Sequence, residues 1–224
     1  MRPDDIIQRA EVLGDRVNGH PEHCGAVLPE LLRMLPETDD PEVLTALVEA
    51  LGHAWHKDAA AALLPYTNHP DGRVRLAVAQ RLTNGVDGSD ELAADVVNAL
   101  LTLMTDDIDE VRDWSTFSLG VQLHEVDTPQ VRDALRLRLS DPHVDTRYEA
   151  LVGLARRRDP AVLDRIRKEL QPEGVYRLAV EAALYAANPS LVPDLVELES
   201  WWDVDTALLG AAVRSCRSGE PPDS

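Results

Sequence analysis

The sequence is poor in aromatic residues and cysteine, and each shortage narrows the class of protein. Aromatic side chains make up 4% of the 224 residues, with a single phenylalanine. Stacked helices can fill their core with leucine, valine and alanine, so this composition favours an all-helical protein over a β-sandwich. The two cysteines, Cys24 and Cys216, fall near opposite ends of the chain. That separation favours reduced thiols over a disulfide, and therefore a cytoplasmic protein.

Positive charge and long apolar runs are also scarce. The chain has 22 Lys and Arg against 40 Asp and Glu, a net charge of −18. Because binding to phosphates and anionic lipids depends on Lys and Arg, we expect neither nucleic acid nor a membrane as the main partner. Uncharged runs fall short of the roughly 20 residues that span a bilayer. The first twenty residues carry charges throughout, unlike a secretory signal, so we predict a cytoplasmic location.

Catalytic motifs are missing from the sequence as well. It contains no glycine-rich phosphate loop, nucleophile elbow, HExxH or paired CxxC. Two histidine pairs remain, His20 with His23 beside Cys24, and His53 with His56. Each could supply two metal ligands, but neither has a clear completing set in the sequence. We therefore predict no metal, no cofactor and no enzymatic activity.

What the sequence does contain is a pattern that recurs at intervals of about 30 to 37 residues, the range of helical repeats. It is clearest in the segment from Asp141 to Leu154. Positions −1, +3 and +7 relative to Arg147 form one apolar or small stripe of a helix in each copy. A second helix is predicted before each, in segments 28–35, 61–67, 91–104, 130–139, 161–170 and 191–198. The residues that align with Arg147 are Leu44, Arg75, Arg112 and Arg177, with a weaker sixth copy near Thr206.

Two helices per period of this length are typical of α-solenoids, whose repeats bury their apolar faces against their neighbours. The segments LPELLRMLPETDDPEVLTALVEALG and DPHVDTRYEALVGLARRRDPAVLDRIRKELQ resemble HEAT repeats. The shorter copies resemble the HEAT-like repeats of phycobilisome lyase relatives. We therefore expect an all-α solenoid of about 13 helices. A capping helix and linker would occupy residues 1–24, six two-helix repeats residues 25–214, and a flexible tail residues 215–224.

Several dipeptides mark helix starts within this pattern. Thr128, Asp159 and Asn188 each precede a proline, which places an N-cap acceptor before a residue suited to the first helical position. The segment NGVDGSD, residues 84–90, is predicted to be the longest flexible connection.

The recurring arginines have a structural interpretation and an alternative one. The resemblance implies that an arginine at this position pairs with acidic residues in the turns of adjacent repeats. The predicted ladder consists of Arg75, Arg112, Arg147 and Arg177 with Asp71, Asp109 and Asp141. An anion-binding site is the alternative.

Departures from the repeat pattern suggest where a partner could bind. The +2 column of small residues is interrupted by Trp114 and Glu149. Apolar residues also occur opposite the core stripe, where the second helices should face solvent on the concave face. The predicted groove for a protein or peptide comprises Leu76, Trp114, Phe117, His124, Tyr148, Glu149 and Tyr185. Tight curvature or dimer contacts could cover the same residues instead.

Charge along the chain is uneven and bears on the choice of partner. Residues 82–111 hold eight carboxylates and no Lys or Arg, whereas residues 132–168 hold ten of the 22 basic residues. Such a surface could orient a charged protein partner. We predict a non-catalytic interaction scaffold, an adaptor or inhibitor. The alternatives are a HEAT-like enzyme, similar to a bilin lyase or to a DNA glycosylase using tryptophan and a carboxylate, and a self-assembly module.

Overall fold

A computed structural model describes residues 2–89, 91–171 and 174–222 of the chain. These residues form 13 α-helices and no strand, which confirms the all-α fold class. The chain divides into two compact units, unit 1 (Met1–Ser118) and unit 2 (Leu119–Ser224). The helices of unit 1 are α1 (Pro3–Val17), α2 (Cys24–Met34), α3 (Pro41–Gly52), α4 (Lys57–Leu63), α5 (Gly72–Arg81), α6 (Ala93–Leu103) and α7 (Asp109–Phe117). Those of unit 2 are α8 (Pro129–Arg138), α9 (Val144–Arg156), α10 (Leu163–Glu169), α11 (Arg177–Ala186), α12 (Val192–Leu198) and α13 (Thr206–Ser218).

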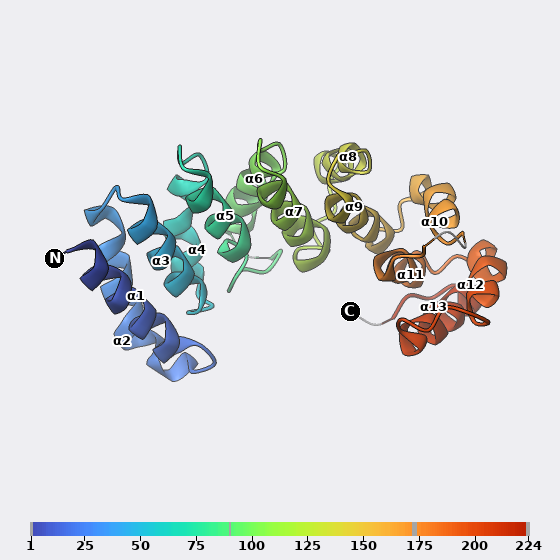
Figure 1. Ribbon diagram of the computed structural model, residues 1–224, viewed down its shortest axis with the longest axis horizontal. Helices are drawn as coiled ribbons and strands as arrows, with labels where there is room; N and C mark the ends of the chain where they lie inside the picture. Colours follow the sequence, from blue (N-terminus) through green and yellow to red (C-terminus); the bar gives the residue numbers. More distant parts are fainter. Residues whose placement is uncertain (1, 90, 172–173, 223–224) are drawn as a thin grey trace. The chain divides into compact units, whose positions relative to one another are not determined.

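Within each unit the helices stack as pairs. In unit 1 the second helices α3, α5 and α7 pack in succession behind α1, and α2 and α6 lie against α3 and α7 (Figure 1). In unit 2 the helices α9, α11 and α13 pack in succession, accompanied by α8, α10 and α12. The helix α1 therefore precedes six helix pairs, as the periodicity of the sequence predicts.

The predicted apolar stripe forms the core of both units. At position +3 of the second helices, Leu47, Val78, Ser115, Ala150 and Val180 are all 0% exposed. Burying one such aliphatic side chain contributes about 1.5 to 3 kcal/mol, so the stripe is the main source of stability in each repeat. The exception at position −1 is Tyr176, which is 49% exposed because it is the N-cap residue of α11 and lies outside the helix.

The predicted helix starts are confirmed by side-chain caps. Thr128 accepts a hydrogen bond from the Val131 amide, and Asn188 accepts one from Ser190. Asp159 accepts one from the Ala161 amide and is also reached by two arginines of α8, Arg132 at 3.1 Å and Arg136 at 2.6 Å. Burial raises the pKa of Asp159, but these hydrogen bonds outweigh it and leave the pKa below its usual value.

Arg75 and Arg177 form contacts between repeats, but with other carboxylates than those predicted. Arg75 binds Asp106 at 2.6 Å and Asp107 at 2.8 Å, both in the turn before α7. Arg177 binds Asp205 at 3.2 Å, in the turn before α13.

The acidic residues predicted as ladder partners are used differently. Asp71 forms its ion pair with Arg73 and caps α5. Asp109 does bind Arg112, at 2.6 Å, but within its own repeat. The Asp141 carboxylate pairs with Arg138. Short acidic side chains at helix starts are close to the amides of their own turn, and these local bonds decide their orientation.

A feature shared by three of the arginines lies within each repeat. The Nη1 atoms of Arg75, Arg112 and Arg147 each donate to the carbonyl six residues earlier, at distances of 2.8 to 2.9 Å. These carbonyls lie in the turns between paired helices, where backbone acceptors lack a helical donor. Each of these arginines therefore fixes the turn within its own repeat. The three carbonyls belong to His69, Asp106 and Asp141.

A buried arginine that the repeat pattern does not single out organises the start of unit 2. Arg157 is 5% exposed, and its guanidinium donates to five backbone carbonyls at 2.8 to 3.2 Å. Burial lowers the pKa of Arg157 to about 10, so the side chain stays charged at neutral pH. The carbonyls belong to Leu119, Gly120, Leu123, Val126 and Gly153.

The last helix continues past the expected start of the tail. α13 runs to Ser218, four residues beyond the predicted boundary at residue 214. The Ser215 hydroxyl donates to the Leu184 carbonyl at 2.7 Å, and the buried Cys216 thiol donates to Ala183 at 3.3 Å. These contacts with α11 hold the end of the helix in place. Both cysteines are free thiols.

None of the helices in the described part of the chain combines the length and the apolar composition needed to cross a membrane.

Candidate functional site

The predicted groove residues of unit 1 lie on α5 and α7. Trp114 is 38% exposed and packs edge to face on Phe117, with ring centroids 5.8 Å apart. Phe117 and Leu76 are half-buried. The indole of Trp114 is thus accessible to solvent while it packs against Phe117. This arrangement suits an aromatic contact residue.

In unit 2 the prediction that Tyr148 is an exposed contact residue is wrong. Tyr148 is 6% exposed, because its ring stacks on Tyr176 at 4.7 Å and its hydroxyl donates to the Glu169 carboxylate at 2.5 Å. Burial, together with this bond to an anion, raises the pKa of Tyr148. Arg165 holds the same carboxylate at 2.7 Å. Tyr148 therefore joins α9 to α10 and to the start of α11.

The other groove residues predicted in unit 2 are half-buried. The Arg156 guanidinium lies 3.6 Å from the ring centroid of Tyr185 and donates to its hydroxyl at 2.6 Å. His124 lies beside Glu125 at 3.3 Å, and Glu149 lies on α9. Tyr185 is thus held by Arg156 of α9. None of these three residues is an exposed apolar side chain of the kind predicted for the groove.

The two adjacent tryptophans before α13 differ in burial. Trp202 is 4% exposed, and its indole N–H donates to the Val175 carbonyl at 3.1 Å, whereas Trp201 is 42% exposed. Trp202 is therefore a core residue, and only Trp201 of this pair is accessible.

The assignment of Tyr148 to the core can be tested by removing its hydroxyl alone. We expect Tyr148→Phe to lower the free energy of unfolding by about 1 kcal/mol, because Glu169 loses a donor in a poorly hydrated position. The change is measured by urea denaturation. A variant as stable as the wild type would mean that the hydroxyl faces water.

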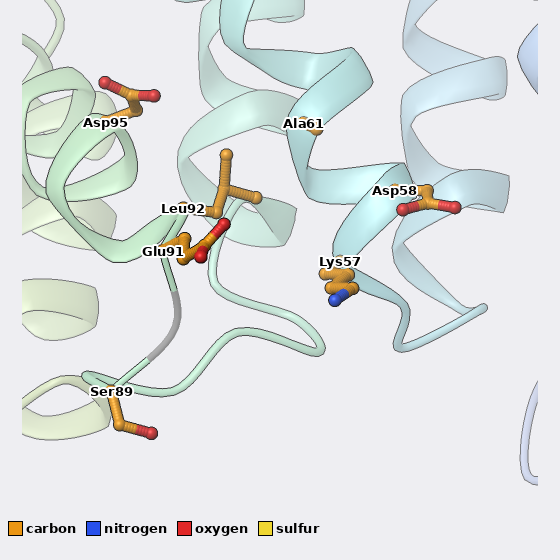
Figure 2. Close-up of a pocket in the computed structure, with 7 residues that line it drawn as sticks. All are labelled: Lys57, Asp58, Ala61, Ser89, Glu91, Leu92 and Asp95. Atoms are coloured by element: carbon orange, nitrogen blue, oxygen red, sulfur yellow. The ribbon is translucent and has the colours of Figure 1, made fainter.

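A cleft between α4 and the start of α6 offers a site that the groove prediction did not include. Its volume is about 520 Å³. Figure 2 shows Lys57 and Ala61 on α4 facing Glu91 and Leu92 before α6. The remaining lining residues are Asp58, Ser89 and Asp95, so the lining contains three carboxylates, one ammonium group and two apolar side chains.

The segment leading into this cleft carries an exposed tryptophan in an unusual conformation. Trp55 is 64% exposed and has φ of 46°, the left-handed region that glycine usually occupies after a helix. A bulky residue there is strained by roughly 1 to 2 kcal/mol. Strain of this kind combined with an exposed aromatic ring is typical of binding sites.

The loop predicted to be flexible holds Trp55 in this conformation. The Asn84 side-chain amide donates to the Gly52 carbonyl at 3.0 Å, and Asn84 itself is buried. Gly85 has φ of 82° and lies directly against the backbone of Trp55 and His56. The beginning of the 84–90 segment is thus anchored, and Asp90 lies outside the described residues.

Unit 1 carries most of the negative charge. Its sequence has 22 Asp and Glu against nine Lys and Arg, a net charge of −13 out of −18. Seven of the nine basic side chains are held in ion pairs with carboxylates of the same unit. The excess carboxylates, including those of the cleft, therefore dominate the field at the surface.

Sequence reasoning missed the cleft and Trp55 for different reasons. The acidic segment 82–111 is evident in the sequence and contains Glu91 and Asp95, but its proximity to α4 depends on tertiary packing. Trp55 lies between helices and outside the repeat alignment. The signal available was an aromatic residue in a short connection, three positions after the glycine that ends α3.

Comparison with known proteins begins with a family model. The family model described as HEAT repeats matches residues 28–120, which confirms the resemblance to HEAT-repeat proteins over this segment. Over 96 residues the chain is 32% identical to protein YibA of Escherichia coli strain K12, and equally to YibA of Escherichia coli O157:H7. The match covers 43% of this chain and 34% of either relative, about a third of their length.

Solved structures extend the likeness in fold over nearly the whole chain. The X-ray structure of YibA superimposes with a TM-score of 0.69 at 20% identity, covering 96% of this chain and 82% of that chain. An engineered protein gives a TM-score of 0.56 at 18% identity, covering 100% and 95%. At these identities the likeness establishes the helical-repeat fold.

Proposed function

We propose that the chain is a non-catalytic interaction scaffold whose unit 1 binds a basic segment of a partner protein. The observation that carries this proposal is the exposed Trp55, strained in the turn after α3 and two residues before Lys57 of the acidic cleft. Tryptophan is the best aromatic partner for an Arg or Lys side chain, and the cleft supplies carboxylates for the same cations.

The surrounding charge supports a protein partner over a nucleic acid. A net charge of −13 repels phosphates and attracts Lys and Arg. Leu92 and Ala61 also line the cleft. A peptide that alternates basic and apolar residues would satisfy both features, because apolar burial gives affinity and charge gives orientation. Trp114 on α7 adds a second accessible indole in the same unit.

The proposal is tested by affinity capture from an extract of the source organism with the full chain immobilised. We expect captured proteins to carry a basic segment and to be released at about 0.5 M salt, where screening acts over roughly 4 Å. The double variant Glu91→Lys with Asp95→Lys should lose them, because it reverses the charge of the cleft.

A matched charge reversal in unit 2 provides the control. Glu199→Lys with Asp203→Lys alters two exposed carboxylates outside the proposed surface and should leave capture unchanged. Equal capture by the cleft variant and the wild type would contradict the proposal. Salt-sensitive retention of duplex DNA would favour a glycosylase-like protein instead.

A further inference from the structure

The turn between α1 and α2 brings together two histidines and a glutamate. Residues Pro21–His23 form a single turn of 3₁₀ helix, η1, closed by a hydrogen bond of 3.0 Å from the His23 amide to the His20 carbonyl. In 3₁₀ geometry the side chains at i and i+3 eclipse, so His20 and His23 project to the same side. Pro21 fixes the first φ angle of this turn.

Glu22 completes a set of three ligand atoms. Its Oε1 atom lies 3.2 Å from Nδ1 of His20 and 3.9 Å from Nε2 of His23. All three ligand atoms lie within 4.8 Å of one another. Around a tetrahedral zinc ion with bonds of about 2.0 to 2.2 Å, ligand atoms are roughly 3.3 Å apart, so small rotations of exposed side chains would close the set.

We propose that His20, Glu22 and His23 form a surface site for a divalent transition-metal ion of the Zn²⁺ class. Two imidazoles and a carboxylate are ligands that Zn²⁺ prefers, and three protein ligands leave a position open for water or for a side chain of a partner. The three side chains are 42% to 62% exposed, so an ion can reach them from solvent. The net charge of unit 1 raises the local concentration of cations.

Neighbouring groups define the extent of the site. Cys24 follows directly in the sequence, but its thiol donates to the Ala54 carbonyl at 3.9 Å. It is therefore turned inward and is not a fourth ligand. In the second histidine pair, Nδ1 of His56 accepts a hydrogen bond from the Asp58 amide and caps α4.

The site is tested by calorimetric titration of Zn²⁺ alone into tag-free full-length protein, stripped of metal with a chelator and dialysed. We expect saturable binding of one ion per chain. His20→Ala, Glu22→Gln and His23→Ala should each weaken binding by at least about tenfold, because each removes one of three ligands. All three positions are accessible to solvent, so the metal-free variants should melt as the wild type does.

The control is His124→Ala, which removes another histidine beside a glutamate, at 3.3 Å, in unit 2. It should bind Zn²⁺ as the wild type does. Absence of saturable binding, one ion shared by two chains, or wild-type affinity in Glu22→Gln would each overturn the three-ligand site.

Discussion

Arg157→Met is expected to lower the melting temperature by at least about 10 °C, through unfolding of unit 2. The guanidinium donates to five buried or half-buried carbonyls, in the segment from Leu119 to Val126 and at the end of α9. Each buried carbonyl that loses its donor costs about 1 to 3 kcal/mol, so the total loss should be at least about 3 kcal/mol. Differential scanning calorimetry of the full chain measures it.

The neighbouring residue gives a matched control. Arg158 is exposed, and its guanidinium donates to the Gly219 carbonyl at 2.6 Å. Arg158→Met makes the same chemical change one position further on and should cost about 0.5 kcal/mol or less. Arg157→Lys should retain part of the stability, because an ammonium group has three donors but lacks the planar fork. Equal melting temperatures for Arg157→Met and Arg158→Met would show that the buried guanidinium is not required.

Gly85→Ala is expected to lower the free energy of unfolding by at least about 3 kcal/mol. A Cβ atom at Gly85 would lie 2.4 Å from the His56 amide nitrogen and 2.4 Å from the Trp55 carbonyl carbon, and both are backbone atoms that cannot rotate away. The left-handed φ of 82° adds about 1 to 2 kcal/mol for any residue with a Cβ. Urea denaturation measures the loss.

Gly19→Ala separates strain from collision. Gly19 has φ of 72°, but nothing lies within 4 Å of a Cβ built there. This control should therefore cost only the conformational term, about 1 to 2 kcal/mol. Equal free energies of unfolding for the two variants would contradict the close approach of Gly85 to the backbone of Trp55. If Gly85→Ala has the lower free energy of unfolding, as we expect, Trp55 should also lose its left-handed conformation and with it the proposed contact surface.

The sequence predicts the helices well because their stabilising contacts repeat. An apolar stripe at positions −1, +3 and +7 can bury itself only if each helix is packed by its neighbours, and Leu47 and Val180 are fully buried as that pattern requires. The N-cap residues Thr128 and Asn188 are predictable for the same reason, since capping depends on adjacent residues.

The interaction surface is less predictable because it depends on contacts between residues far apart in the sequence. Tyr148 lies opposite the core stripe of its helix, yet Glu169 and Tyr176 cover it from the next repeat. The backbone conformation of Trp55 depends on Gly85, 30 residues later in the sequence, which lies directly against it. Helical periodicity describes one helix and its own repeat, and it contains no information on such longer-range contacts.

The most direct test of the scaffold proposal is a nuclear magnetic resonance titration of the full chain with a synthetic peptide that carries the basic segment of a captured partner. The chain has four tryptophans, and each indole N–H gives one resonance, which single Trp→Phe variants assign. The proposal predicts that the Trp55 resonance shifts with peptide concentration while those of Trp201 and Trp202 stay in place. A shift of the Trp201 resonance with an unchanged Trp55 resonance would contradict it.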